Sequence, residues 1–390
     1  MRRVTPTPSV KVVTIGELHV GARFEDAARE WLSRALVRRG WRPSVLGFTG
    51  YGTTAWARVL GRVLLRRRGE PRTSTGETRG WRSFLALDVP DVPVTAEVGG
   101  VRRVVTSDRG GYIDAMVPCA LTPGWHDAHL TVAGSAPVVA PVRVVAPDAR
   151  AGLISDIDDT VLDTALPRPL LAFWNTFVLR EHARRPVPGM ARFYASVIAA
   201  HPDAPVFYLS TGAWEVAPTL ARFLATHGLP PGPLLLTDWG PAQNSWFRDG
   251  RAHKRQVLTR LVAEYPDLRW LLVGDDGQAD PELYGELVRA APSHILAVAI
   301  RALSPVRKAL ATSAPHYGHG HSVLGTDRHR FKGPADGDTA WVTGPDGDAL
   351  LAALREHNLI PAPGAPSAPT VPSASSVPSA PGGRRTPGDS

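Results

Sequence analysis

Between residues 150 and 302, short apolar runs alternate with segments of helical periodicity, and this alternation constrains the fold of the 390-residue chain more than any other feature. The apolar runs lie at 152–155, 206–209, 234–236, 270–273 and 295–300, with helical patterns at 190–200, 215–227, 255–265 and 281–291. Such alternation predicts an α/β fold with a doubly wound parallel sheet. A strand at 340–343 and a helix at 348–357 extend the pattern.

The region before this one has a different period. From about 44 to 147, short valine-rich runs repeat with period two, and glycine-containing turns separate them. These runs lie at 55–65, 83–89, 94–98, 112–117, 127–132 and 138–145. Short alternating strands at this spacing predict a small antiparallel β-sandwich or barrel.

The changes of pattern divide the chain into four parts. We expect an N-terminal helical segment at 1–43, with one amphipathic helix at 22–40, then a β-sandwich-like domain at 44–148 and an α/β domain at 149–360. Residues 361–390 are mainly Pro, Ala, Ser and Gly. Because this tail has little apolar surface to bury, it is predicted to be disordered.

Charge and composition limit the classes of partner and the cellular compartment that we expect. The net charge is +8, which favours acidic partners such as phosphorylated substrates or an anionic membrane surface. No nucleic-acid partner is expected, because no aromatic-interleaved basic motif accompanies the charge. The single Cys119 cannot form an internal disulfide, and neither a secretory signal nor a membrane-spanning run is visible. We therefore expect a cytoplasmic protein, with peripheral membrane contact left open.

Acidic side chains follow the first predicted strand of the α/β domain. Asp156, Asp158, Asp159 and Asp163 come directly after the apolar run at 152–155. Ligand sites in parallel sheets form at the carboxyl ends of strands. Carboxylates gathered there repel one another unless they bind a cation or take part in phosphate chemistry.

A second acidic group follows the strand predicted at 270–273. Asp275, Asp276 and Asp280 lie in the loop after it. Magnesium prefers carboxylate oxygens and usually keeps several of its waters. Two acidic strand ends side by side therefore predict a Mg²⁺ site.

Two non-acidic elements lie between the acidic groups. The strand at 206–209 ends in Ser210, Thr211 and Gly212, whose hydroxyl and N–H groups suit a phosphate at the start of a helix. Lys254 is expected to open the helix before the second acidic strand, where an ammonium neutralises a phosphoryl oxygen. Neither the 210–212 segment nor Lys254 is specific by itself. They support a phosphate site because they occur between the two acidic groups, in a fixed order along the chain.

In that order the motifs resemble those of the haloacid dehalogenase superfamily. Residues 45–360 resemble more closely the phosphatidate phosphatase catalytic-domain family, whose fungal members include an actin-patch-associated enzyme and which has a bacterial branch. The resemblance is carried by the segments 50–53, 156–160, 208–212, 236–240 and 274–282. One departure is Asp276, because the family usually has Gly-Asp-Ser where this chain has Gly-Asp-Asp.

The resemblance implies roles for individual residues. Asp156 is expected to be the nucleophile that forms an aspartyl-phosphate, and Asp158 the general acid and base. Ser210 and Lys254 are expected to hold the phosphoryl oxygens, with Thr211 and Gly212 also binding substrate. Mg²⁺ is expected at Asp156, Asp275 and the backbone carbonyl of Asp158. Whether Asp276 or Asp280 joins this set stays open.

The substrate implied is phosphatidate or a related phospholipid. Residues 164–188 are bulky and apolar and then basic, which suits a lipid phosphate at an anionic membrane or a helix that only packs on the core. Two alternatives remain: a phosphatase for a soluble metabolite or nucleotide, and a membrane- or protein-binding adaptor with a vestigial site. The histidine-rich run at 316–321 is either a metal-binding segment or a polar loop.

Overall fold

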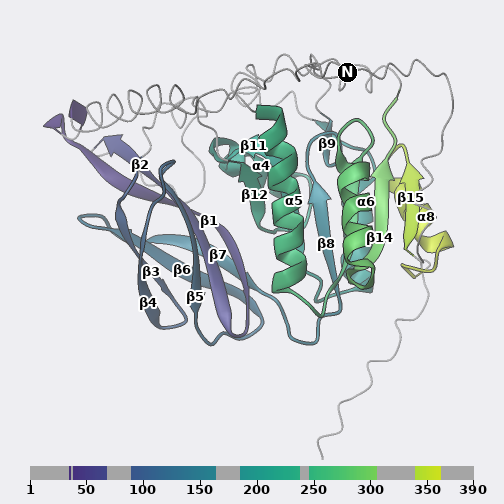
Figure 1. Ribbon diagram of the computed structural model, residues 1–390, viewed down its shortest axis with the longest axis horizontal. Coiled ribbons are helices and arrows are strands. Elements are labelled where there is room, and N and C mark those ends of the chain that lie inside the picture. The colour runs from purple at the N-terminus through teal and green to yellow at the C-terminus, as the bar shows by residue number, and fades with distance from the viewer. Residues whose placement is uncertain are drawn as a thin grey trace, which may run out of the picture.

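The computed structural model describes residues 35–36, 38–67, 89–163, 185–237, 246–304 and 339–361. They form a seven-stranded sheet and a six-stranded sheet, together with a two-stranded ribbon of β9 (Leu162–Asp163) and β10 (Arg185–Pro186). The two large sheets lie side by side (Figure 1). The histidine run at 316–321 and the tail after 361 lie outside the described residues, as do most of the strand predicted at 83–89 and most of the segments at 22–40 and 164–188.

The first sheet is a single, barrel-like sheet rather than two packed layers. Its strands are β1 (Trp41–Thr53), β2 (Trp56–Arg67), β3 (Pro93–Val98), β4 (Val101–Thr106), β5 (Tyr112–Pro118), β6 (Gly124–Val132) and β7 (Val138–Val144), in the order β4-β3-β6-β7-β1-β2-β5. Among the pairings of these described strands, only that of β1 with β7 is parallel. The two edge strands approach each other, and the Arg103 guanidinium donates to the Met116 carbonyl at 2.7 Å. The sandwich expectation was therefore wrong, and the barrel-like alternative is confirmed.

Two strands of this sheet, β1 and β4, were not predicted. Glycines interrupt the period-two pattern of β1, and they are needed because its neighbours come very close. A Cβ at Gly50 would lie 2.2 Å from the Arg58 carbonyl oxygen, and one at Gly52 would lie 2.2 Å from the Trp56 carbonyl oxygen. Nearly every residue of β4 is exposed, because β4 is an edge strand, so its sequence shows no alternation.

The second sheet is parallel throughout, as predicted. Its strands are β8 (Ala151–Asp156), β11 (Val206–Ala213), β12 (Leu234–Thr237), β13 (Arg269–Asp275), β14 (Ile295–Arg301) and β15 (Ala340–Gly344), in the order β12-β11-β8-β13-β14-β15. From β8 the chain adds β11 and β12 on one side, then returns to add β13, β14 and β15 on the other. A ligand crevice is expected where the order reverses, outside the carboxyl ends of β8 and its neighbours.

The helices agree with the predicted pattern except in one place. They are α3 (Met190–Ala200), α4 (Ala217–Thr226), α5 (Trp246–Glu264), α6 (Asp280–Ala290) and α8 (Gly347–Glu356). α5 and α6 contact each other and lie in front of the sheet in Figure 1. α5 begins nine residues before the predicted start at 255, so Lys254 lies inside the helix rather than at its opening. None of the described helices is long and apolar enough to cross a membrane.

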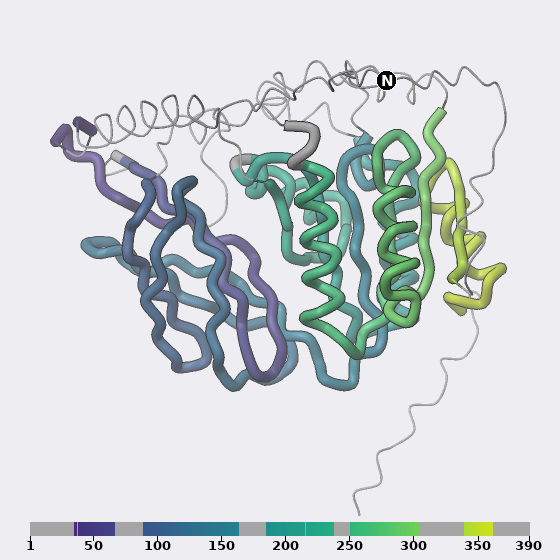
Figure 2. Tube along the Cα trace, viewed as in Figure 1, coloured from purple at the N-terminus to yellow at the C-terminus, as the bar shows by residue number. Residues whose placement is uncertain are grey.

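The two large sheets share a hydrophobic core. Tyr51 of β1 is fully buried and packs edge-on against Phe207 of β11, with ring centroids 5.1 Å apart. The Tyr265 hydroxyl, just after α5, donates to the Gly52 carbonyl at 3.2 Å. The Cα traces of the two units run close together along this boundary (Figure 2). The β-barrel is thus packed directly against elements that carry the candidate site.

Candidate active site

Three buried carboxylates meet at the carboxyl edge of the parallel sheet. Asp156 ends β8, Asp275 ends the neighbouring β13, and Asp280 is the first residue of α6. One carboxylate oxygen from each lies within 4.8 Å of the others. Parallel pairing of β8 with β13 brings the first two together, and the short turn into α6 brings the third. Asp156 of the first predicted acidic group and Asp275 and Asp280 of the second therefore form one cluster.

Lys254 joins this cluster from the middle of α5. Its ammonium donates to Asp156 Oδ1 at 2.6 Å and to Asp280 Oδ1 at 2.7 Å, and its side chain is only 4% exposed. The sequence placed Lys254 near the acidic strands but did not reveal its second partner. A lysine that holds two carboxylates in place also fixes their spacing.

The charges in the cluster do not balance. Burial raises the pKa of Asp156 well above its usual range; Lys254 opposes this shift, and Asp280 and Asp275 add to it. Burial also raises the pKa of Asp275, and Asp280 adds to the rise. Burial lowers the pKa of Lys254, but the two carboxylates that it contacts more than offset this and leave it raised. Three carboxylates around one ammonium thus leave excess negative charge, which a proton or another cation has to neutralise.

The oxygens available for a cation belong to the two strand ends. Asp156 Oδ2 and Asp275 Oδ2 are buried and have no hydrogen-bond partner among the described residues. The other oxygen of Asp275 accepts from the Gly277 N–H at 2.7 Å. Because hard divalent cations prefer carboxylate oxygens, these two buried oxygens and the adjacent third carboxylate fit a cation of that class.

The structure distinguishes the two aspartates that the sequence left open. Asp280 contacts Lys254 and lies within the carboxylate cluster. Asp276 is not part of that cluster, and its Oδ1 accepts from the Leu303 N–H at 2.8 Å. The residue that departs from the usual family pattern therefore fixes the loop after β14 and stands apart from the cluster.

The remaining predicted residues lie at the ends of the neighbouring strands. The Ser210 hydroxyl, at the end region of β11, donates to Asp158 Oδ2 at 2.8 Å and accepts from the Gly212 N–H at 2.9 Å. Thr211 is half-buried, and its carbonyl accepts from the Thr237 hydroxyl at 2.8 Å. The carboxylate of Asp158 is thus bound to Ser210 and does not belong to the three-carboxylate cluster.

The backbone around the site depends on close packing. A Cβ at Gly274 would lie 2.7 Å from Asp280 Oδ2 and 2.8 Å from the Tyr284 ring, so only glycine lets α6 approach β13 this closely. The Tyr284 hydroxyl donates to the Val273 carbonyl at 2.9 Å and ties α6 to the strand. This approach sets the position of Asp280.

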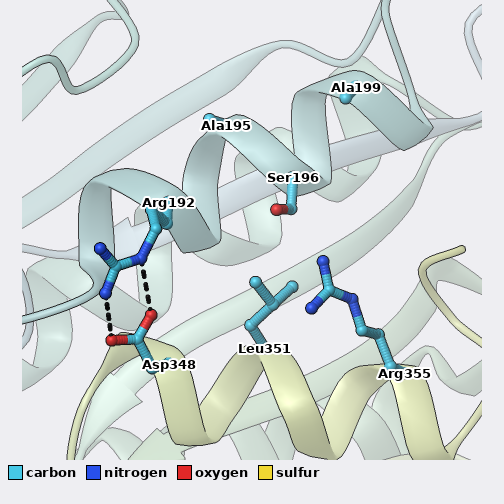
Figure 3. A pocket seen from close by; sticks show the side chains of 7 residues that line it. All are labelled: Arg192, Ala195, Ser196, Ala199, Asp348, Leu351 and Arg355. Carbon is cyan, nitrogen blue, oxygen red and sulfur yellow. Dashed lines mark hydrogen bonds and ion pairs between the residues drawn. The ribbon is translucent and has the colours of Figure 1, made fainter. Parts of the chain in front are cut away.

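A shallow groove between α3 and α8 is separate from this site. Figure 3 shows an Arg192–Asp348 ion pair at one end and Arg355 at the other, with Ala195, Ser196 and Leu351 between them. None of its lining residues belongs to the acidic cluster. The groove is therefore not part of the candidate active site.

Residues 151–302, which include every predicted site residue, match the family model for the catalytic domain of phosphatidate phosphatase APP1. The predicted resemblance to this family is confirmed over these residues, while the part of it predicted for 45–150 and 303–360 lies outside the match. Phosphatidate phosphatase APP1 of Saccharomyces cerevisiae is 27% identical over 154 residues, which cover 39% of this chain and 26% of that protein. An uncharacterized protein of Schizosaccharomyces pombe is 26% identical over 150 residues, covering 38% of this chain and 24% of that protein. The matched part thus spans about a quarter of these curated relatives.

Similarity to solved structures is weak. A carbohydrate acetylesterase from Xanthomonas citri aligns at 11% identity with a TM-score of 0.25, covering 67% of this chain and 68% of that chain. A likeness at this level carries no argument about fold or function. The β-barrel and the β15–α8 unit lie outside the residues that match the family model.

Proposed function

We propose that this protein is a Mg²⁺-dependent phosphatase that hydrolyses a phosphate monoester, phosphatidate or a related phospholipid, through an aspartyl-phosphate intermediate. One observation carries the proposal. In the segment that matches the phosphatase family, Lys254 holds Asp156 and Asp280, while Asp156 and Asp275 each keep one buried carboxylate oxygen that no described residue hydrogen-bonds. That arrangement suits a nucleophilic carboxylate beside a divalent cation.

Magnesium is the proposed cofactor because the available donors are hard oxygens. Asp156, Asp275 and Asp280 are the residues that would hold it, together with the backbone carbonyl of Asp158 that the family resemblance implies. In this structure that carbonyl accepts a weak hydrogen bond from the Gln278 amide at 3.3 Å. When bound, Mg²⁺ would neutralise negative charge on the phosphoryl group and on the carboxylates around it.

The first half of the proposed reaction uses Asp156 and Asp158. A carboxylate oxygen of Asp156 attacks phosphorus, and the bond from phosphorus to the leaving alkoxide breaks. Asp158 gives its proton to that alkoxide, so the alcohol leaves neutral. Lys254 stabilises the ionised, nucleophilic form of Asp156, which burial alone would disfavour.

The second half regenerates the carboxylate. Asp158, now ionised, takes a proton from a water molecule that attacks the phosphorus of the aspartyl-phosphate. The bond between phosphorus and Asp156 breaks, and inorganic phosphate is released. The contact of Ser210 with Asp158 supports a shared role near the transferred group, where the hydroxyl and the Gly212 N–H would bind phosphoryl oxygens.

The lipid substrate is supported by the family and by the chain's charge. The yeast relative is a phosphatidate phosphatase by name, and the net charge of +8 favours peripheral contact with an anionic membrane. We extend the proposal to a cytoplasmic protein that meets its substrate at such a surface. The adaptor alternative is disfavoured by the intact cluster of Asp156, Lys254 and Asp275.

The decisive measurement is phosphate release by the purified protein with and without Mg²⁺. The substrates would be a chromogenic phosphate ester, phosphatidate in mixed micelles, sugar phosphates and nucleotides, with Asp156→Asn as the control. Mg²⁺-dependent release that disappears in the variant supports the chemistry. Preference for phosphatidate supports the lipid assignment, whereas preference for a soluble ester favours the metabolite alternative. If phosphate is released from none of these substrates, the adaptor alternative with a vestigial phosphatase site is favoured.

A further inference from the structure

A second buried cation lies beside the acidic cluster. Arg301 ends β14, directly opposite Asp275 in the β13–β14 pairing, and is 6% exposed. Its guanidinium donates from Nη1 to the Asp159 carbonyl at 2.6 Å and from Nε to the Pro345 carbonyl at 3.1 Å. One side chain thus joins the loop after β8 to the turn between β15 and α8.

The residue that Arg301 holds has an unusual backbone. Asp159 has φ +58°, in the left-handed region that residues other than glycine seldom adopt. It directly follows Asp158, so its backbone conformation determines how the chain leaves the proposed general acid. A strong, charge-assisted hydrogen bond to the Asp159 carbonyl stabilises this conformation.

The same strand end also anchors the second acidic loop. The Asp276 N–H donates to the Arg301 carbonyl at 3.1 Å, and Asp276 Oδ1 accepts from the Leu303 N–H at 2.8 Å. Residues 301–303 therefore contact both loops that carry the cluster. Through Arg301 they hold the loop of Asp158, and through their backbone they hold the loop that follows Asp275.

We infer that Arg301 is a positioning residue for the phosphatase site: its guanidinium holds the Asp159 carbonyl and so orients Asp158 relative to Asp156. This inference rests on the proposed function. The positioning role requires the planar guanidinium of an arginine, whose several N–H donors have fixed directions. A positive charge alone does not suffice, because a lysine ammonium is a point charge on a flexible chain. Arg301 itself, being buried and bound to two carbonyls, is assigned no contact with substrate.

The test compares Arg301→Lys and Arg301→Gln with Arg192→Gln, which removes an exposed arginine from its pair with Asp348. Steady-state kinetics are measured with the best substrate. We expect both Arg301 variants to lose kcat by roughly 10- to 100-fold, as misplacement of a reacting group does, with KM changed less than about threefold. Arg192→Gln should behave as the wild type. A kcat within about twofold of wild type in Arg301→Lys would overturn the positioning role and leave charge as the only requirement.

A second readout does not depend on turnover. Hydrogen exchange is followed by mass spectrometry in peptides that cover 156–163 and, for comparison, 206–213. In Arg301→Lys we expect faster exchange in the first peptide and unchanged exchange in the second. Unchanged exchange in both would overturn the inference even if Arg301→Gln fails to fold. If the wild-type protein releases no phosphate, the proposed function fails, and the exchange result still decides whether Arg301 holds the loop.

Discussion

Lys254 Nζ lies 2.6 Å from Asp156 Oδ1, and both side chains are almost completely buried. The pair is not isolated, because the same ammonium contacts Asp280 at 2.7 Å. A buried ammonium between two carboxylates makes their ionisation interdependent. Removing any one of the three groups should therefore affect both the stability and the chemistry of the site.

Replacing Lys254 with methionine should destabilise the protein strongly. The variant leaves two buried carboxylates without their cation, which typically costs roughly 3–5 kcal/mol. Mg²⁺ should restore part of the loss, because it binds the folded form. Urea unfolding with and without Mg²⁺ measures both effects. Arg255→Met on the same helix is the control. Its ion pair with Glu286 is exposed, so its loss should lower the free energy of unfolding by less than about 1 kcal/mol. Equal effects of the two substitutions would contradict the assignment.

Asp280 and Asp276 should differ in their effect on Mg²⁺ binding. Asp280→Asn removes a charge from the carboxylate cluster, and we expect the apparent Mg²⁺ affinity to fall by at least roughly 10- to 100-fold, the cost of losing even a supporting residue of a metal site. Asp276→Asn keeps an amide oxygen for the Leu303 N–H and should change the affinity by less than about threefold. Mg²⁺ titrations of thermal stability and of phosphate release give both numbers. A larger loss in Asp276→Asn would reverse the assignment.

The sequence predicted most of the parallel sheet and the residues at its carboxyl edge. Local signals suffice there, because Asp156 and Asp275 each follow a continuous apolar run that marks a buried strand. The carboxyl ends of parallel strands meet, so the two acidic groups could be brought together without knowing any other contact. Ser210 and Lys254 were then predicted from the positions of their motifs between the two acidic groups.

Other features depend on contacts that no local pattern records. The early start of α5 was missed because residues 246–254 are mostly polar and include Gly250, so no apolar stripe marks the first turns. The role of Arg301 depends on a backbone carbonyl 142 positions earlier in the chain. The β1 strand was not predicted because glycines interrupt its alternating pattern. These glycines allow β1 to approach β2 closely, a contact that is known only once both strands are located in the fold.

His253 should make the protein less stable below neutral pH. Burial lowers its pKa to about 4, with a hydrogen bond to the Leu235 backbone opposing the shift and Arg260 and Lys254 adding to it. In the unfolded chain the histidine has a pKa near 6.5, so between pH 6.5 and 4 it is protonated there while the folded His253 stays neutral. The contribution of His253 to the free energy of unfolding is therefore present above pH 6.5 and is lost as the pH falls toward 4. Between pH 7 and 4.5 the wild type should lose roughly 2–3 kcal/mol more than His253→Gln.

The measurement for His253 is urea unfolding at a series of pH values. Subtracting the curve of His253→Gln removes the contributions of the carboxylates, which both proteins share. His129→Gln, at an exposed position of β6, is the matched control for the loss of a histidine. Parallel curves for wild type and His253→Gln would show that this histidine is not the group responsible.

The β-barrel and the α/β unit should unfold together. Tyr51 is fully buried against Phe207, and Phe48 stacks on Trp214 with ring centroids 4.7 Å apart. Tyr51→Ala should therefore cost roughly 3–5 kcal/mol, as large aromatic truncations do, and lower the stability of both units at once. Coincident transitions by circular dichroism and tryptophan fluorescence would show this. Val104→Ala, at a position 67% exposed, is the control; two separate transitions would contradict the shared core.

Two glycines near the N-terminal half of α6 should respond to alanine in opposite directions. A Cβ at Gly274 would lie 2.7 Å from Asp280 Oδ2, so Gly274→Ala should displace Asp280, weaken Mg²⁺ binding and cost roughly 1–3 kcal/mol of stability through overpacking.

At Gly285, inside α6, the nearest atom to a new Cβ is the flexible end of Arg289 at 3.5 Å. Gly285→Ala should therefore stabilise the helix by roughly 0.5–1 kcal/mol and leave Mg²⁺ binding unchanged. Thermal melts with and without Mg²⁺ separate the two effects for each variant. If Gly274→Ala keeps the wild-type response to Mg²⁺, then Asp280 does not depend on the close approach of α6 to β13, and its place in the cation site would have to be reconsidered.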